Sequence, residues 1–372
     1  MPYTKWYNVH ERHSLSEFKI EGFILAAAVV LFFFHFIGAR INRTKARSWL
    51  KSNISVLREE FALLGTDRRR VYESDDMLLQ ERSLSEFATY ASGRQNVAFV
   101  DVTIKMAKRY NPIMNLLETG AGFASDMFSI PEDVADVVVY PFDGKENLTV
   151  PALRSMPEES YRESKSAFDG FVWALVNKSR MQKLRDDRYD VSLTVTKDHA
   201  KLPAWLTVMT ESAEITDFLL TKELIAAVEA VGDDFDYLIV TDQPLEQPST
   251  LDETTPRKRI YLKYHLPSSG DYEAFAPLLA LTIRLPDSLV ENRLRPELLK
   301  KLRQPRDAKI NQIKKAQEEE KAEERAADRE KNKKAKRDAE LQGLSAKAQK
   351  KFLEKEAAKE QRRAQKKMSM RG

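Results

Sequence analysis

The chain has 372 residues, of which 42% are hydrophobic and 32% are charged, and its formal net charge is +4. This length leaves room for roughly two average domains, and the apolar content is sufficient for one sizeable core. The chain contains no cysteine, which excludes disulfide bonds, thiolate metal sites and a cysteine nucleophile.

The positive charge is concentrated near the C-terminal end. Residues 306–371 hold 22 Lys and Arg against 13 Asp and Glu, a net of +9, so the remainder of the chain sums to −5. The sequence therefore describes a mildly acidic body followed by a basic tail.

The apolar segment at residues 22–39, GFILAAAVVLFFFHFIGA, predicts one transmembrane helix. A helix of this length spans about 27 Å, close to the hydrocarbon thickness of the endoplasmic reticulum bilayer. A signal peptide is the alternative, but the leading residues mix acidic and basic side chains. Five basic residues follow the segment directly, namely Arg40, Arg43, Lys45, Arg47 and Lys51.

This basic flank predicts the topology, because basic flanks remain cytosolic. Residues 1–21 are then a short lumenal N-terminus, and the bulk of the chain is cytosolic. Four N-glycosylation sequons, at Asn42, Asn53, Asn147 and Asn177, all follow the apolar segment. A glycan on any of them would contradict this orientation.

Three residues of the apolar segment are candidates for contact with a partner helix. Gly22 and Ala26 form a small-xxx-small pair that allows close approach of another helix. His35 is the single strongly polar residue. We interpret it as a neutral imidazole near the cytosolic interface or against a partner helix, the alternative being a functional intramembrane group.

After a basic juxtamembrane and amphipathic segment at 40–65, residues 66–300 are predicted to form the cytosolic body. Apolar spacings predict that the amphipathic helix covers residues 50–64 and ends at Gly65. Alternation of apolar and polar residues predicts a strand at 98–106. Further strand candidates lie at 134–140, 189–196, 205–209, 237–241 and 260–266, and residues 158–185 and 215–231 are predicted to be helices. Mixed elements of this kind indicate an α+β or α/β body, with the strand order left open.

A search of this body for catalytic or metal-binding patterns finds no enzyme signature. Gly120 and Gly122 lack the remaining residues of a phosphate loop and are interpreted as a helix-ending loop. His199 follows Asp198 in a polar stretch and is interpreted as part of a turn.

Two further polar segments occur later in the body. Asp233, Asp234 and Asp236 fit no cation-binding spacing and are interpreted as a solvated turn. His265 lies in a predicted strand with no ligand at metal-site spacing. We expect no catalytic residue, no metal, no cofactor and no small-molecule substrate.

The tail begins with an apolar stripe surrounded by cations. Leu294, Leu298 and Leu302 are expected to pack on the body while the charges face outward. These charges, the first candidates for binding an anionic partner, are Arg293, Arg295, Lys300, Lys301 and Arg303.

The rest of the tail, within 301–372, is predicted to be a long charged helix. Residues 307–342 contain no Pro or Gly, and apolar residues are too sparse for a coiled-coil seam. Gly343 predicts a break, and Ser345 the cap of a second helix. Further candidate phosphate- or RNA-binding residues are Lys333, Lys334, Lys336, Arg337, Lys350, Lys351, Arg362, Arg363, Lys366 and Lys367. Phosphate contact suits them better than lipid binding, and a merely solvated tail is the alternative.

The chain resembles the calumin family, the coiled-coil-domain-containing proteins of the endoplasmic reticulum membrane. The likeness covers the anchor, body and tail and is most specific at residues 202–216, LPAWLTVMTESAEIT, and 171–184, FVWALVNKSRMQKL. The resemblance implies a non-enzymatic subunit of the PAT complex, an intramembrane chaperone. It also implies an Asterix-type small membrane protein, the Sec translocon, translating ribosomes and nascent multipass clients as partners.

The same resemblance implies that the basic pairs of residues 350–367 contact the ribosome. One departure is that animal members carry a long acidic lumenal segment linked to calcium binding, whereas 21 mixed-charge residues precede the anchor here. Whether this chain binds calcium is therefore left open. Two alternatives remain open, a membrane-tethered enzyme acting on lipid or phosphate substrates and a tether whose tail binds a protein.

Overall fold

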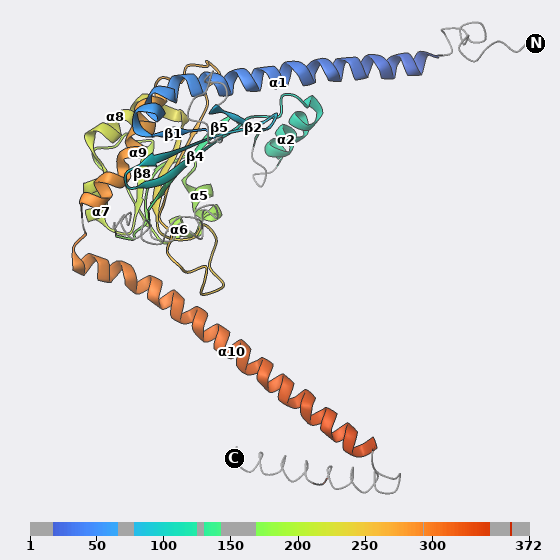
Figure 1. Ribbon diagram of the computed structural model, residues 1–372, viewed down its shortest axis with the longest axis vertical. Helices are drawn as coiled ribbons and strands as arrows, with labels where there is room; N and C mark the ends of the chain where they lie inside the picture. Colours follow the sequence, from blue (N-terminus) through green and yellow to red (C-terminus); the bar gives the residue numbers. More distant parts are fainter. Residues whose placement is uncertain are drawn as a thin grey trace, which may run out of the picture. The chain divides into compact units, whose positions relative to one another are not determined.

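A computed structural model describes residues 18–65, 78–124, 130–142, 169–292, 294–342 and 358 (Figure 1). The chain divides into two compact units, residues 1–304 and 305–372. The first unit holds a long N-terminal helix and a body of mixed α and β structure, as the sequence predicts.

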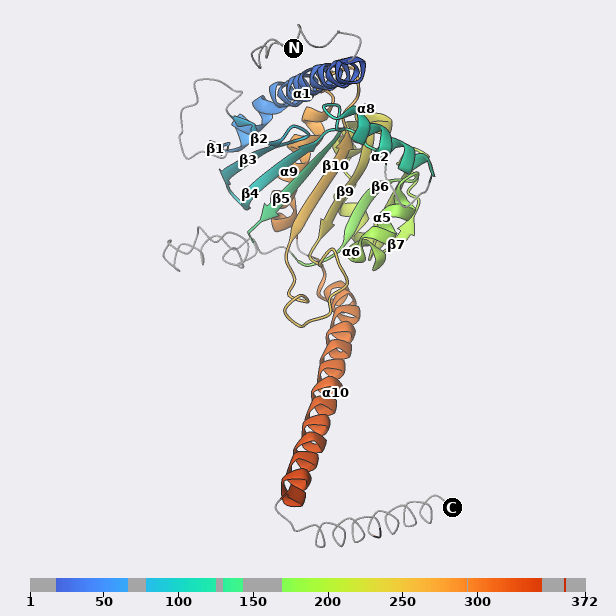
Figure 2. The same ribbon diagram turned by 90° about the vertical axis from the view of Figure 1, so that its right-hand side faces the viewer.

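The body is built on an antiparallel sheet. In the described part of the chain, its strands follow the order β1-β3-β4-β5-β10-β9-β6-β8-β7 (Figure 2). β2 pairs with residues 86–88 at the start of β3. The strands are β1 (Leu63–Leu64), β2 (Gln80–Ser83), β3 (Glu86–Arg94), β4 (Val97–Lys105), β5 (Val134–Pro141), β6 (Trp173–Asn177), β7 (Val195–Lys197), β8 (Leu206–Thr210), β9 (Phe235–Thr241) and β10 (Arg259–His265).

Helices cover both faces of this sheet. The helices are α1 (Lys19–Glu60), α2 (Pro112–Ala124), α5 (Met181–Asp187), α6 (Tyr189–Ser192), α7 (Ala213–Leu219), α8 (Lys222–Val231), α9 (Phe275–Glu291) and α10 (Pro296–Gln342). Trp173 and Leu175 of β6 join the core beneath α1, α8 and α9, whereas Ala174 and Val176 join a smaller cluster beneath α5 and α6. Because side chains alternate along a strand, these two clusters lie on opposite faces.

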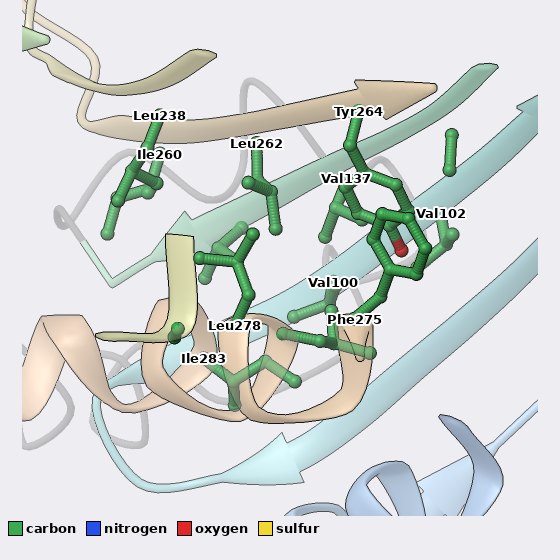
Figure 3. Packing of buried hydrophobic residues seen from close by; sticks show 14 of the residues in the cluster. Val100, Val102, Val137, Leu238, Ile260, Leu262, Tyr264, Phe275, Leu278 and Ile283 are labelled. Atoms are coloured by element: carbon green, nitrogen blue, oxygen red, sulfur yellow. The ribbon is translucent and has the colours of Figure 1, made fainter. Parts of the chain in front are cut away.

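The larger cluster forms the main core (Figure 3). Leu278 and Ile283 of α9 pack against Val100, Val137 and Leu262 from three neighbouring strands. Burying an aliphatic side chain of this size contributes about 1.5–3 kcal/mol, so this interface accounts for much of the stability of the body.

α1 runs unbroken from the apolar segment into the body. Its second half buries Trp49, Leu50 and Leu57 in the core, as the amphipathic spacing predicts. At its far end, Glu60 forms ion pairs with Arg94 and with Arg284, the latter at 2.6 Å between Nε and Oε1. The expected helix end at Gly65 is wrong by a few residues, because Leu63 and Leu64 leave the helix to pair with β3.

Two sequence predictions are wrong over part of their length. Of the helix expected at 158–185, residues 158–168 lie outside the described residues and 181–185 are helical in α5, but the prediction is wrong where β6 lies. The β6 residues are buried on both faces and form a continuous apolar run without strand alternation. The strand expected at 189–196 is wrong as well. Arg188 pairs with Asp190 at 2.7 Å, α6 forms a single turn, and only β7 is extended.

Three smaller corrections concern polar or glycine-containing segments. The helix expected at 215–231 is divided at Thr221, whose Oγ1 accepts a hydrogen bond from the backbone N–H of Leu224 and caps α8. Gly120 and Gly122 lie within the last turns of α2 rather than in a loop. Asp236 is not solvated but 4% exposed in β9, where its carboxylate lies 3.4 Å from Lys263 Nζ.

Candidate functional site: the anchor–body junction and the basic helix

The apolar half of α1 projects away from the body with its side chains exposed. Phe23, Leu25 and Phe36 are 77%, 67% and 70% exposed, as expected for side chains that face lipid. By length and composition this helix can cross a membrane, and within the described residues it is the single helix that meets this test.

The last turn of the apolar segment contacts the body directly. A Cβ atom added to Gly38 would lie 2.3 Å from the carbonyl carbon of Arg109 and 2.4 Å from the nitrogen of Tyr110. Only glycine therefore permits this approach. One turn earlier, the His35 ring meets the Tyr110 ring edge-on at 5.9 Å between centroids. His35 thus lies against the body rather than projecting freely into lipid.

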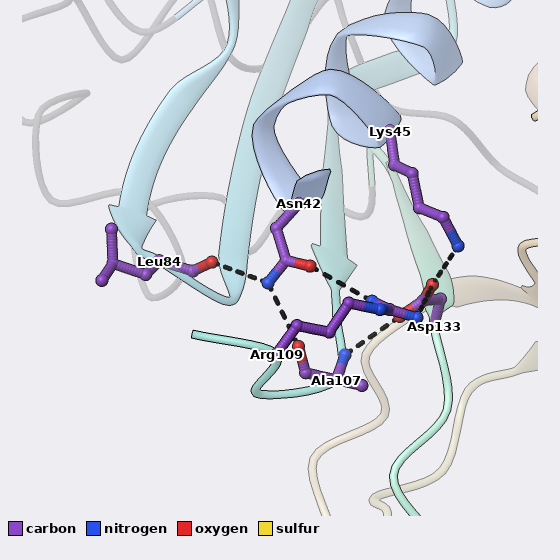
Figure 4. Close-up of polar contacts among 6 residues, drawn as sticks. All are labelled: Asn42, Lys45, Leu84, Ala107, Arg109 and Asp133. Atoms are coloured by element: carbon purple, nitrogen blue, oxygen red, sulfur yellow. Dashed lines mark hydrogen bonds and ion pairs between the residues drawn. The ribbon is translucent and has the colours of Figure 1, made fainter. Parts of the chain in front are cut away.

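A polar cluster fixes the junction just beyond this contact (Figure 4). Asn42 is fully buried, and its Nδ2 donates to the carbonyl oxygens of Leu84 at 2.9 Å and Ala107 at 3.1 Å. Arg109 Nη1 donates to Asn42 Oδ1 at 3.1 Å. Asn42 therefore joins two separate segments of the body, at Leu84 and at residues 107–109, to α1.

Asp133 is the centre of the same cluster. Arg109 donates to both of its carboxylate oxygens, at 2.7 and 2.8 Å, and Lys45 Nζ donates to Oδ2 at 2.7 Å. The backbone N–H of Ala107 donates to Oδ1 at 3.0 Å. Burial alone would raise the pKa of Asp133, but these hydrogen bonds outweigh it and lower the pKa.

The basic flank after the apolar segment is thus partly engaged by the body. Besides Lys45, Arg43 donates to both carboxylate oxygens of Glu81, at 2.8 and 2.9 Å. The hydrogen bond from Arg43 lowers the pKa of Glu81. Sequence reasoning missed Glu81, Arg109 and Asp133, whose partners are 24 or more positions away in the chain.

The other candidate surface is the start of α10. Leu298 and Leu302 are 7% and 4% exposed and belong to the main core, and Leu294 packs partly against it. This confirms the apolar stripe expected from the sequence. Three of the expected cations on the same segment, Lys300, Lys301 and Arg303, are exposed.

The remaining predicted site residues are distributed as follows. Arg295 is exposed, and its Nε lies 3.8 Å from Glu214 Oε2. Lys333, Lys334, Lys336 and Arg337 lie on the helical backbone of α10. Arg293, Lys350, Lys351, Arg362, Arg363, Lys366 and Lys367 lie outside the described residues, as do Gly343 and Ser345. Gly22 and Ala26 are exposed, and a Cβ atom on Gly22 would meet nothing within 4 Å.

The remaining candidate polar groups of the body are those of His199 and His265. Across the described ranges, His, Asp and Glu side chains form no group of three that could hold a metal ion. His199 lies in a turn, 4.0 Å from Asp217. His265 Nδ1 lies 2.9 Å from Glu132 Oε2 and its Nε2 3.7 Å from Asp236 Oδ2, a cluster beside the paired Lys263.

These features define a membrane-associated protein with an apolar N-terminal helix, an antiparallel α and β body and a charged helical extension. The family described as PAT complex subunit CCDC47 matches residues 17–363, and the chain belongs to this family. The family relationship expected from the sequence is thereby confirmed.

Individual relatives agree with this assignment. The chain is 27% identical to a UPF0674 endoplasmic reticulum membrane protein of Schizosaccharomyces pombe, over 95% of this chain and 87% of the relative. It is 23% identical to a UPF0674 endoplasmic reticulum membrane protein of Saccharomyces cerevisiae, over 80% and 76%. It is 20% identical to the human PAT complex subunit CCDC47, over 77% of this chain and 57% of the human protein.

Proposed function

We propose that this chain is a non-enzymatic adaptor and chaperone subunit of the endoplasmic reticulum membrane. It crosses the bilayer once through α1, keeps its body on the cytosolic side and binds ribosomal RNA phosphates through its basic helical tail. As a PAT complex subunit it assists the insertion and folding of multipass membrane proteins beside the Sec translocon.

The observation that carries this proposal is the arrangement of charge at the start of α10. Leu298 and Leu302 hold this segment in the core, so Lys300, Lys301 and Arg303 are presented from a fixed base. Cations that contact phosphates release counterions and bind without reading base sequence, which suits a large folded RNA. The sequence beyond residue 304 adds further basic residues, which are proposed to contribute additional phosphate contacts.

The proposed topology is supported by the junction. Arg43 and Lys45 of the basic flank pair with Glu81 and Asp133 of the body, so flank and body lie on the same side of the membrane. Because basic flanks remain cytosolic, that side is the cytosol.

The sequons provide a weaker test of topology than the sequence suggests. Asn42, Asn53 and Asn177 are 0%, 0% and 6% exposed, so a glycan on any of them is incompatible with this packing. Orientation is better tested with single cysteines, because the chain has none. A cysteine at exposed Val195 should react with an impermeant maleimide in intact microsomes, and protection of this cysteine would reverse the topology.

The membrane partners are assigned to the exposed half of α1. Gly22 and Ala26 are free of contacts with the described body and leave room for a close helix, which we assign to an Asterix-type small membrane protein. Nascent multipass clients and the Sec translocon are proposed as neighbours of the same segment by family membership.

Cosedimentation with purified ribosomes over a series of salt concentrations tests the ribosome assignment. The full chain in detergent is expected to bind at low salt and dissociate as salt rises, and a chain stopped after Gln304 should bind more weakly. Unchanged binding after truncation would place the contact in the body. Failure of the full chain to bind ribosomes at any salt concentration would refute the assignment.

Two other functions are tested by the same material. A tail that binds a protein partner would retain its target after ribosomal RNA is digested, whereas the proposed contact would be lost. A membrane-tethered enzyme would require turnover of lipid or phosphate substrates that disappears when polar residues of the body are replaced.

A further inference from the structure

α2 has an inverted pattern of exposure. Its apolar residues Ile113, Leu116, Leu117 and Phe123 are 57%, 74%, 63% and 79% exposed. None of its 13 residues is buried, although the helix carries only one charged residue, Glu118. A helix of a soluble body would place its apolar face inward, so this exposed face requires another covering.

The polar side of α2 faces the protein. At about 100° per residue, Asn115, Glu118, Thr119 and Gly122 fall on one side of the helix, and all four are half-buried, as are Pro112 and Ala121. Glu118 Oε1 accepts from Lys108 Nζ at 2.5 Å. A Cβ atom on Gly122 would lie 2.8 Å from Ile130 Cγ1, so this side of the helix is closed by the chain itself.

α2 begins beside the end of the apolar segment of α1. Tyr110, two positions before α2, touches Gly38 and His35, which belong to the last turns of residues 22–39. The Asn111 side chain accepts from the backbone N–H of Met114 at 3.1 Å and starts the helix there. Figure 1 shows α2 set apart from the sheet, on the side toward which the apolar half of α1 projects.

We propose that α2 is an interfacial membrane helix, whose Ile113, Leu116, Leu117 and Phe123 side chains enter the same leaflet from which α1 emerges. With 13 residues α2 is too short to cross the bilayer but long enough to lie along its surface. Lipid fits this face better than a protein partner, because the exposed apolar side chains of α2 lie beside the end of the apolar segment of α1, where α1 would leave the acyl region. Tyr110, which contacts His35 there, is a residue type enriched at membrane–water interfaces.

The composition of α2 also indicates whether its membrane insertion depends on the charge of the lipid headgroups. The helix has no Lys or Arg, and its one carboxylate is paired. Interfacial helices that depend on anionic lipid carry cations on their polar face. Insertion of α2 therefore depends on apolar burial and proceeds equally in neutral bilayers.

Fluorescence quenching in proteoliposomes of neutral phosphatidylcholine tests this assignment. Single cysteines replace Leu116 or Phe123 in the full chain, which has no other cysteine, and carry an environment-sensitive dye. Val195→Cys is the matched control, an exposed apolar position at 60% on the far edge strand β7. Leu31→Cys, within the apolar segment, reports the anchor.

Labels at Leu116 and Phe123 are expected to be blue-shifted and quenched by lipids spin-labelled near the headgroup. Quenching by lipids labelled near the terminal methyl should be strongest at Leu31, and Val195 should respond to aqueous iodide alone. Adding Leu117→Gln and Ile113→Gln beside the label at Leu116 should abolish its lipid quenching. The unfolding transition should stay unchanged, because α2 buries no residue.

Three results would overturn the inference. Iodide accessibility at Leu116 equal to that at Val195 would show an uncovered surface. Protection from both iodide and lipid would show that protein, such as a second copy of the chain, covers the face. If labels at Leu31 and at α2 both show no lipid quenching, neither α1 nor α2 enters the bilayer, and both assignments are refuted. Ribosome binding by the tail is measured in a separate experiment and is not affected by this result.

Discussion

The indole nitrogen of Trp49 donates a hydrogen bond to the phenolic oxygen of Tyr264 at 2.9 Å, and both residues are fully buried. Trp49 lies on α1, ten positions beyond the apolar segment, and Tyr264 lies on β10 near the middle of the sheet. The anchor helix is thereby joined to the body by a buried polar contact as well as by apolar packing.

Removing the acceptor of this hydrogen bond should destabilise the body. Tyr264→Phe leaves the indole N–H of Trp49 buried without a partner, which costs about 1–3 kcal/mol. Chemical denaturation of the full chain in detergent measures this loss. In a double-mutant cycle with Trp49→Phe, the two losses should not add, and strict additivity would show that the hydrogen bond contributes nothing.

Gly38 provides a test of the contact between anchor and body. Gly38→Ala places a Cβ atom 2.3 Å from the backbone of Arg109, so the segment before α2 must move away. We expect a lower melting temperature and faster proteolysis at residues 106–111. Gly22→Ala is the matched control, because nothing lies within 4 Å of its added Cβ. Equal behaviour of the two variants would disprove the close packing.

The Asp133 cluster predicts a specific pH dependence. Because the folded-state pKa of Asp133 is lowered, its contribution to stability is present above the unfolded pKa of about 3.9 and is lost as pH falls through the folded value. Asp133→Asn should therefore cost about 1–3 kcal/mol near neutral pH, because hydrogen bonds to a charged acceptor are lost.

The measurement is the difference in unfolding free energy between the parent and Asp133→Asn along a pH series. This difference should shrink as the pH falls below about 4, where the carboxylate of the unfolded parent becomes protonated. A difference that stays constant down to the lowest pH would mean that the charge of Asp133 does not stabilise the junction.

The start of α10 predicts separable effects on stability and binding. Reversing charge with Lys300→Glu, Lys301→Glu and Arg303→Glu should leave the unfolding free energy nearly unchanged, because all three side chains are exposed. Ribosome cosedimentation should weaken and lose part of its salt dependence. Leu302→Ala is the contrasting variant, expected to destabilise the body by about 2–4 kcal/mol because Leu302 is 4% exposed.

The sequence predicts the parts of this fold in which one face is buried. β4, β5 and β10 alternate between buried and less buried positions, and all three are among the predicted strands, β4 from that alternation. β8 and β9 were located from short apolar runs, and α1 from its apolar spacing. Family membership was also recognisable from two short segments, 171–184 and 202–216.

The sequence does not predict the elements and contacts that depend on residues far away in the chain. β3 is rich in Ala, Ser and Thr and is extended because β1, β2 and β4 pair with it. α9 was overlooked because Pro286, usually a helix breaker, lies inside it and is buried in the core. The junction partners Arg109 and Asp133 lie in segments without periodicity, where no local pattern reveals a salt bridge.

α1 contains no proline from Lys19 to Glu60, so the membrane segment and the buried half form one stiff rod of about 63 Å. Packing on the core and the ion pairs of Glu60 prevent this rod from pivoting against the body. If α1 crosses a bilayer as proposed, a change in bilayer thickness or a neighbouring helix that tilts α1 would rotate the whole body through the same angle. The orientation of the body would then depend on the tilt of α1 in the bilayer.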